Sequence, residues 1–193
     1  MSRAQYPMSE NAAQRLAREG YHALIICEGT AEEVVIKKLI DADALIFPQE
    51  DVTEVTRTRK ASEIQANYLS YDFPWPVCIM RVLDSRKESF QLGSLHVNRY
   101  PVINVFTHPE MEALVIVREG MWQQWSKVKS SVRPSVYCKQ ELGMKKIKRA
   151  AFLEAYWDVG SIVAAARDYR RLSKIPAGEL CLADVIKEDL IAS

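Results

Sequence analysis

The sequence predicts an α/β fold, in which a largely parallel β-sheet is flanked by helices and followed by a helical C-terminal extension. Three apolar runs, His22–Cys27, Val77–Leu83 and Val102–Phe106, have the length and continuous hydrophobicity of buried parallel strands. Helical patterns lie between the strand-like runs, and this alternation is typical of sheets built from strand–helix–strand units.

The composition is that of a globular protein with its own core. The chain has 193 residues, 48% of them hydrophobic and 26% charged, which is enough for one domain with a small appendage. No apolar run approaches the ~20 residues that span a bilayer, and the polar N-terminus carries no signal peptide pattern, so we expect a cytoplasmic protein without membrane segments. The four cysteines form no CxxC pair, and this argues against a zinc site or a disulfide framework.

The N-terminal part of the chain has helix and strand signals in close succession. Ser9 is expected to cap a short helix from Glu10 to Glu19, which Gly20 ends. The strand His22–Cys27 follows, and then a helix runs from about Ala31 to Asp41 with an apolar stripe on one face.

The middle of the chain is expected to alternate between short elements. Ala44–Phe47 has the pattern of a short strand, which Pro48 closes, and the polar, threonine-rich segment Gln49–Lys60 is expected to be a loop. A helix is expected from Ala61 to Leu69. Another is expected from about Pro109 to Trp125, because proline is well suited to a first helical turn.

Helical patterns dominate the C-terminal third. They predict three helices, at about Met144–Val159, Ser161–Ser173 and Leu182–Ile191. The expected organisation is therefore an N-terminal helical segment (1–20), an α/β domain (21–130) and a helical extension packed on that domain (131–193).

Acidic side chains follow each of the three clearest strands. Glu28 stands before Gly29 at the end of the first, Asp84 ends the second, and Glu110 and Glu112 follow the third. Parallel strands place their carboxyl ends at one edge of the sheet, so these carboxylates are expected to lie together. Oxygen ligands of this kind suit Mg²⁺ or Mn²⁺, with Glu28 as a metal ligand or general base.

Each of these acids also has a purely structural interpretation. Glu28 could serve only the positive end of the following helix, and Asp84 could cap a helix or close a turn. Glu32 and Glu33 stand in a first helical turn, where acids are common, so the structural interpretation is favoured for both.

A basic run, Lys127–Arg149, contains eight lysines and arginines and a single acid, Glu141. It could follow a phosphate backbone or be a solvated face. Lys145 and Lys146 are the chosen candidates for a phosphate contact, and Lys148 is a third. The four tryptophans, 75, 122, 125 and 157, are interpreted as packing residues rather than as platforms for nucleic-acid bases.

The turn Glu28-Gly29-x-x-Glu32 and the later strand ending in Asp84 resemble motifs of the Toprim-domain family. The segment His108-Pro-Glu-Met-Glu112 is similar to one in small stand-alone Toprim-like proteins of the OLD, RloB and abortive-infection type, and the resemblance covers about residues 21–117. It implies a compact α/β sheet, a Mg²⁺ site and phosphodiester hydrolysis on DNA or RNA. By the same resemblance, action in phage defence and a partner ATPase of the ABC type are plausible, whereas the sequence leaves open whether the chain forms an oligomer.

The chain departs from the family at Arg86, which stands where the second acid of an Asp-x-Asp motif is expected. Either Glu88 substitutes for that acid, or a single metal is bound, or the site binds without catalysis. The sequence thus predicts a Mg²⁺-dependent Toprim-like nuclease. The alternatives are a non-catalytic regulatory or binding subunit of a larger assembly and a phosphoesterase acting on a nucleotide.

Overall fold

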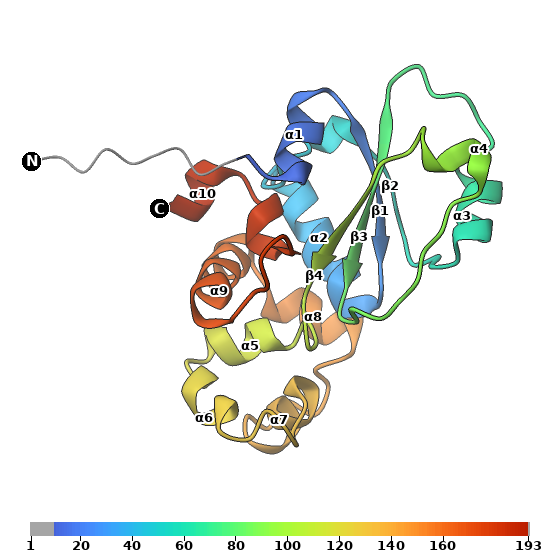
Figure 1. The fold of residues 1–193 in the computed structure, drawn as a ribbon. Coiled ribbons are helices and arrows are strands. Elements are labelled where there is room, and N and C mark those ends of the chain that lie inside the picture. Colours follow the sequence, from blue (N-terminus) through green and yellow to red (C-terminus); the bar gives the residue numbers. More distant parts are fainter. Residues whose placement is uncertain (1–9, 193) are drawn as a thin grey trace, which may run out of the picture.

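The computed structural model describes residues 10–192. It contains a five-stranded, all-parallel sheet with the strand order β2-β1-β3-β4-β5, flanked by helices, and a mainly helical C-terminal region (Figure 1). The predicted α/β class is therefore confirmed. The strands are β1 (His22–Cys27), β2 (Val52–Thr56), β3 (Val77–Leu83), β4 (Val102–Phe106) and β5 (Leu180–Cys181).

The helices are short apart from two, α2 and α9. They are α1 (Ala12–Arg18), α2 (Thr30–Asp41), α3 (Ala61–Asn67), α4 (Ser94–Val97), α5 (Ala113–Arg118), α6 (Trp122–Ser126), α7 (Pro134–Gln140), α8 (Ala150–Tyr156), α9 (Val159–Leu172) and α10 (Glu188–Ala192). Two 3₁₀ turns, η1 (Gln49–Asp51) and η2 (Leu182–Val185), complete the fold.

The two faces of the sheet pack into separate apolar clusters. In β1, Ala23, Ile25 and Cys27 point to the larger cluster, while Leu24 and Ile26 point to the smaller one. This alternation follows from the period of two along a strand. Both sets must be apolar because helices α2, α8 and α9 cover one face and α3 lies against the other (Figure 1).

The carboxyl ends of β1, β3 and β4 lie at the same edge of the sheet, as predicted. The backbone N–H of Glu28 donates to the carbonyl of Val82, and the N–H of Thr107 donates to the carbonyl of Leu83. The residues that directly follow these three strands therefore lie close together at the carboxyl edge of the sheet, and the candidate site is at this edge.

Two predictions in the middle of the chain are wrong. Ala44–Phe47 is not a strand, since Leu45 makes only an isolated antiparallel bridge to Ile186; the segment is apolar because it is buried. The segment Gln49–Lys60, expected to be a loop, contains η1 and the edge strand β2. The polar and partly exposed side chains of β2 concealed it, because an edge strand needs no continuous apolar run.

The helix expected from Pro109 to Trp125 is in fact two helices. The helix α5 begins only at Ala113, so Pro109 does not occupy a first turn, and Gly120 separates α5 from α6. Gly120 has a φ of 69°, a left-handed conformation that glycine adopts without strain.

The C-terminal helices are confirmed only in part. The helix α9 matches the prediction closely, and Asp158 caps its start, but the expected helix Met144–Val159 is reduced to α8. The expected helix Leu182–Ile191 is replaced by β5, η2 and α10, and α4 and α7 were not predicted. At the N-terminus Asn11 caps α1, and the expected cap Ser9 lies outside the described residues.

The C-terminal region shares the core of the sheet. Ile162, Ala166 and Val185 belong to the same apolar cluster as Ile25 and Val105. Strand β5 pairs directly with β4, so the last part of the chain completes the sheet as well as covering it. No helix among the described residues is long and apolar enough to cross a membrane.

Candidate functional site

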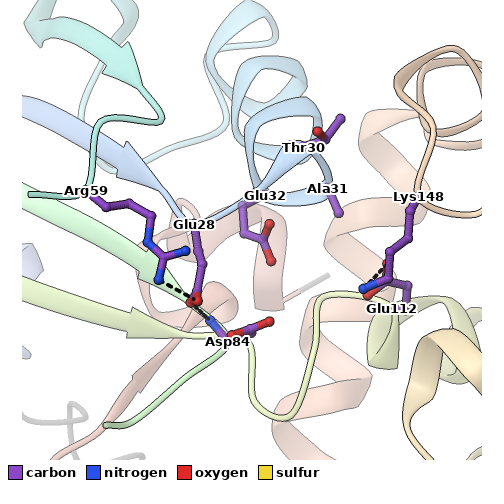
Figure 2. A pocket seen from close by; sticks show the side chains of 9 residues that line it. Glu28, Thr30, Ala31, Glu32, Arg59, Asp84, Glu112 and Lys148 are labelled. Carbon is purple, nitrogen blue, oxygen red and sulfur yellow. Dashed lines mark hydrogen bonds and ion pairs between the residues drawn. The ribbon is translucent and has the colours of Figure 1, made fainter. Parts of the chain in front are cut away.

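A polar cavity of about 340 Å³ lies at the carboxyl edge of the sheet (Figure 2). Four carboxylates, one arginine and one lysine line it, together with the start of α2. The lining residues are Glu28, Gly29, Thr30, Ala31, Glu32, Arg59, Asp84, Glu112 and Lys148.

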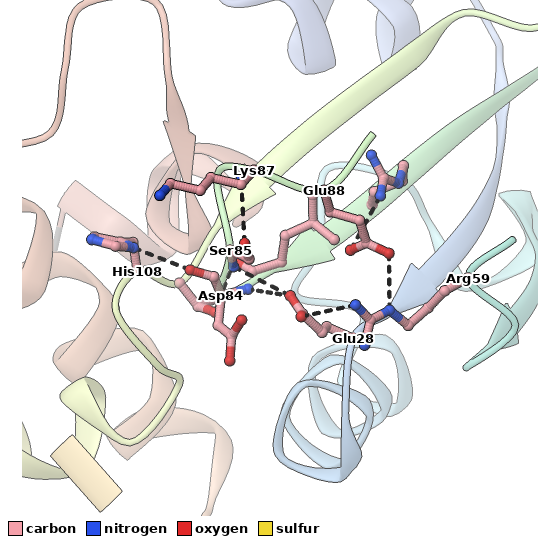
Figure 3. A network of polar contacts seen from close by, with 10 residues as sticks. Glu28, Arg59, Asp84, Ser85, Lys87, Glu88 and His108 are labelled. Atoms are coloured by element: carbon pink, nitrogen blue, oxygen red, sulfur yellow. Dashed lines mark hydrogen bonds and ion pairs between the residues drawn. The ribbon is translucent and has the colours of Figure 1, made fainter. Parts of the chain in front are cut away.

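Glu28 is held in place from two sides. Its Oε2 accepts hydrogen bonds from the backbone N–H groups of Asp84, at 2.8 Å, and Ser85, at 3.3 Å. Its Oε1 lies 3.1 Å from the Arg59 guanidinium. Glu28 thus links the end of β1 to the turn after β3 and orients the residues of that turn (Figure 3).

Asp84 lies beside Glu28, whose Oε2 accepts the backbone N–H of Asp84. Burial and this proximity to Glu28 raise the pKa of Asp84 to about 6. On the other side of the residue, the Nδ1 of His108 lies 3.1 Å from the backbone carbonyl oxygen of Asp84 (Figure 3). The turn is therefore held to β4 as well as to β1.

Glu32 and Glu112 are almost fully buried, being 5% and 3% exposed, yet both line the cavity. Burial, together with the charges of Glu112, Asp84 and Glu28, raises the pKa of Glu32 to about 7. Burial also raises the pKa of Glu112. The cavity thus holds more negative charge than the surrounding protein balances.

Gly29 leaves room for the Glu32 carboxylate. A Cβ at this position would lie only 3.0 Å from Glu32 Oε2. The turn from β1 into α2 therefore brings both Glu28 and Glu32 to the same cavity, because no side chain at position 29 pushes Glu32 away.

Arg59 and Lys148 supply the positive charge at the walls of the cavity (Figure 2). Arg59 pairs with Glu88 at 3.0 Å in addition to Glu28. The Lys148 Nζ lies 3.3 Å from a Glu110 oxygen and 3.7 Å from a Glu112 oxygen, and these two carboxylates raise the pKa of Lys148 against the opposing effect of burial.

The donor set of the cavity fits a hard divalent cation in its chemistry, since all four acidic groups offer oxygen and lack sufficient counter-charge. Among residues 10–192, however, no three His, Cys, Asp or Glu side chains already lie as close together as a metal ion requires. Direct coordination of one ion by three of these carboxylates therefore requires them to move toward one another, whereas one or two carboxylates with bound waters can hold Mg²⁺.

The structure brings together three of the predicted metal ligands and leaves two outside. Glu28, Asp84 and Glu112 line the cavity, but Glu110 and Glu88 do not. One Glu110 oxygen accepts the backbone N–H of Ser135 at 2.8 Å, and the hydrogen bonds from Ser135 and the charge of Lys148 outweigh burial and lower the pKa of Glu110.

Glu88 is engaged by two arginines rather than by the cavity. Besides Arg59, it pairs with Arg81, which is buried in β3 and lies 3.4 Å from Glu88. Glu88 therefore balances a buried arginine and does not substitute for a missing second acid at this cavity.

Lys145 and Lys146 are exposed and do not line the cavity; the lysine that does is Lys148. Two lining residues, Glu32 and Arg59, are not among the site residues that the sequence predicts. Glu32 has the position of an ordinary first-turn acid, although its spacing from Glu28 is a signal that could have identified it. Arg59 stands in a segment whose sequence predicts a loop, and nothing in the sequence near it points to Glu28.

Arg86 does not enter the acidic cavity. Its guanidinium lies 2.8 Å from the carboxylate of Glu179, just before β5. We therefore expect Arg86→Ala to cost less than about 1 kcal/mol in the free energy of unfolding, as for a partly exposed ion pair, and to leave divalent-ion affinity unchanged. Chemical denaturation and titration calorimetry with Mn²⁺ measure the two quantities. A large loss of Mn²⁺ affinity would show that Arg86 acts on the cavity after all.

Comparison of the chain with models of protein families, with curated proteins and with solved structures finds no match.

Proposed function

We propose that this protein is a Mg²⁺-dependent nuclease of the Toprim-like kind, which hydrolyses phosphodiester bonds in DNA or RNA. The observation that carries the proposal is the set of four carboxylates, Glu28, Glu32, Asp84 and Glu112, which come from three sheet-edge segments and line one cavity. Acidic groups gathered at the carboxyl edge of a parallel sheet are a common arrangement for metal-assisted chemistry on phosphates.

The residues that would hold the ion are Asp84, Glu32 and Glu112, whose carboxylates lie at the cavity. Unlike the Glu28 carboxylate, none of them accepts a hydrogen bond from the backbone of another described residue. When bound, Mg²⁺ or Mn²⁺ lowers the pKa of a coordinated water and offsets negative charge on the phosphate. Glu28 holds the Asp84 turn through its Oε2 and can accept a proton from an attacking water through Oε1.

The positive groups of the cavity suit a phosphate as the substrate. Arg59 and Lys148 lie at its walls, and Thr30 and Ala31 belong to the first turn of α2, whose N-cap residue, Gly29, makes no capping side-chain bond. A helix start of this kind offers backbone N–H groups and a positive dipole to phosphate oxygens. These groups would orient the phosphate and stabilise the charge that develops on it.

The biological setting of the proposal rests on the resemblance to Toprim-like proteins alone. That resemblance supports cytoplasmic action in phage defence, with a partner ATPase of the ABC type. A partner would be found by its co-purification with the full chain and by its effect on the rate of cleavage.

The proposal is tested by incubating the purified chain with end-labelled single-stranded DNA, duplex DNA and RNA, in Mg²⁺, in Mn²⁺ or in EDTA. We expect cleavage of at least one substrate with metal and none in EDTA. Glu28→Gln keeps an oxygen that can accept the Asp84 N–H but removes the charge, so cleavage should fall at least about 100-fold. Glu50→Gln, on the exposed turn η1, is the matched control. Intact DNA and RNA with both metals would overturn the proposal, and a wild-type cleavage rate for Glu28→Gln would show that Glu28 takes no part in the chemistry.

A second candidate is a non-catalytic binding or regulatory subunit. It is favoured by the absence, among the described residues, of three carboxylates already in metal-binding range, and by the engagement of both Glu28 oxygens within the protein. It predicts weak divalent-ion binding and no cleavage, so the same experiments separate it from the nuclease.

A further inference from the structure

Two further cavities continue from the acidic one along the sheet edge. The first, of about 420 Å³, shares Asp84 with the acidic cavity and carries Arg86, Lys87 and Arg133. The second, of about 440 Å³, shares Arg86, His108 and Pro109 with the first. The shared residues make each cavity adjacent to the next, with Asp84 between the first two and Arg86, His108 and Pro109 between the last two.

The last cavity in this series, here called the aromatic cavity, has a wall of aromatic rings. The Trp122 ring lies 5.1 Å from the Trp125 ring and 5.7 Å from the Tyr169 ring, measured between centroids. Leu172, 41% exposed, and Ile175 add apolar surface. Such a wall favours a flat, apolar-faced group.

The three rings do not have the same role. Trp125 is buried and its Nε1–H donates to the carbonyl of Val132, so it is a packing residue. Tyr169 is also buried, and its hydroxyl donates to the carbonyl of His108. Trp122 is only partly buried, and its indole N–H has no hydrogen-bond partner among the described residues. Trp122 is therefore the ring best able to receive a ligand.

The charge around the aromatic cavity is positive. It is lined by Arg86, Lys129 and Lys174, and by no carboxylate of the described residues. Lys129 and Lys174, like Lys87 and Arg133 in the neighbouring cavity, are exposed and form no ion pair within residues 10–192. Their charge is therefore available to a polyanion.

We propose that the aromatic cavity holds one nucleobase of a single-stranded nucleic acid, stacked on Trp122, while Lys129 and Lys174 contact its phosphates. The backbone would then pass Lys87 and Arg133 and reach the acidic cavity at Asp84. This inference rests on the proposed function and names its substrate class. A duplex does not fit the aromatic cavity in this way, because its bases are paired and stacked with one another.

The test is binding of a fluorescein-labelled single-stranded oligonucleotide in EDTA, where no cleavage occurs, with a hairpin duplex of the same composition as the comparison. Trp122→Ala is expected to weaken binding of the single strand about 5- to 100-fold, and Trp122→Phe to restore most of the loss. Trp75→Ala is the matched control, since Trp75 is partly exposed and stacks on His22 at the opposite edge of the sheet.

A second measurement does not depend on the packing of Trp122. The double variant Lys129→Ala, Lys174→Ala changes only exposed side chains, and it should reduce the slope of log affinity against log salt by about 1.4, about 0.7 for each lost phosphate contact. Equal affinities of wild type, Trp122→Ala and the double variant for the single strand would overturn the inference, as would tighter binding of the duplex.

The two proposals fail in different ways. If the chain cleaves nucleic acid but binding is insensitive to Trp122 and the two lysines, the base-binding cavity is wrong and the nuclease stands. If the chain binds single strands through Trp122 yet cleaves nothing with Mg²⁺ or Mn²⁺, the cavity stands and the nuclease is wrong.

Discussion

Asp84→Asn is expected to lower metal-dependent cleavage about 100- to 1,000-fold and to weaken Mn²⁺ binding, while the protein remains folded. Asp84 lies beside Glu28 and lines the acidic cavity. Asparagine has almost the same shape and leaves the backbone N–H bonded to Glu28, so only the charge is lost. Single-turnover cleavage rates and Mn²⁺ titration calorimetry measure the two effects.

The matched control for this variant is Asp72→Asn. Asp72 is exposed, pairs with Arg99 and does not line the cavity, so cleavage should not change. Wild-type rates for Asp84→Asn would show that this carboxylate takes no part in the chemistry. An equal loss in both variants would point to a general effect of charge on substrate binding.

Glu32→Gln is expected to remove much of the pH dependence of stability in the absence of metal. Burial and the neighbouring carboxylates raise the pKa of Glu32 from an ordinary value of 4.5 to about 7, and that of Asp84 from 3.8 to about 6. In this window the folded state binds protons that the unfolded state has released. The stability that these groups contribute is therefore fully present below about pH 4 and is lost as the pH rises through 6 to 7.

For Glu32 alone this loss is on the order of 3 kcal/mol, which corresponds to about 6–12 °C in Tm for a chain of this size. Thermal unfolding between pH 4.5 and 8 in EDTA should show a smaller decline in Glu32→Gln than in the wild type. Glu50→Gln, exposed on η1, should behave as the wild type does.

The same experiment is repeated with Mg²⁺ present. At pH 8 the cation is expected to raise the Tm of the wild type, because it neutralises the ionised carboxylates of the cavity, and to raise the Tm of Glu32→Gln much less. Parallel curves of Tm against pH for the wild type and Glu32→Gln would show that the pKa of Glu32 is not raised in the folded protein. A full Mg²⁺ effect in the variant would remove it from the metal site.

The strands β1, β3 and β4 were predictable to the residue because each is a short apolar run bounded by polar or turn-forming residues, as central parallel strands are. The edge strand β2 was not predictable in this way. Its polar residues Thr53, Glu54 and Thr56 interrupt the apolar run, although valine and threonine favour strands, and pairing with β1 makes the segment part of the sheet. Ala44–Phe47 has the opposite problem: its apolar residues predict a strand, but the segment is apolar because it is buried in the core, and it pairs with no strand of the described sheet.

The α/β sheet and the meeting of Glu28 and Asp84 at its carboxyl edge follow from the sequence, because parallel strands must end together. The side chains that join these two carboxylates become evident only in the folded chain. Glu32 reaches the cavity because Gly29 leaves room for its carboxylate. Arg59 reaches Glu28 because β2 pairs with β1 and ends at the same edge of the sheet. Lys148 lines the cavity because the segment before α8 passes close to Glu112. The position of a buried strand in the sequence depends on local patterning, whereas contacts between distant segments depend on how every other element packs.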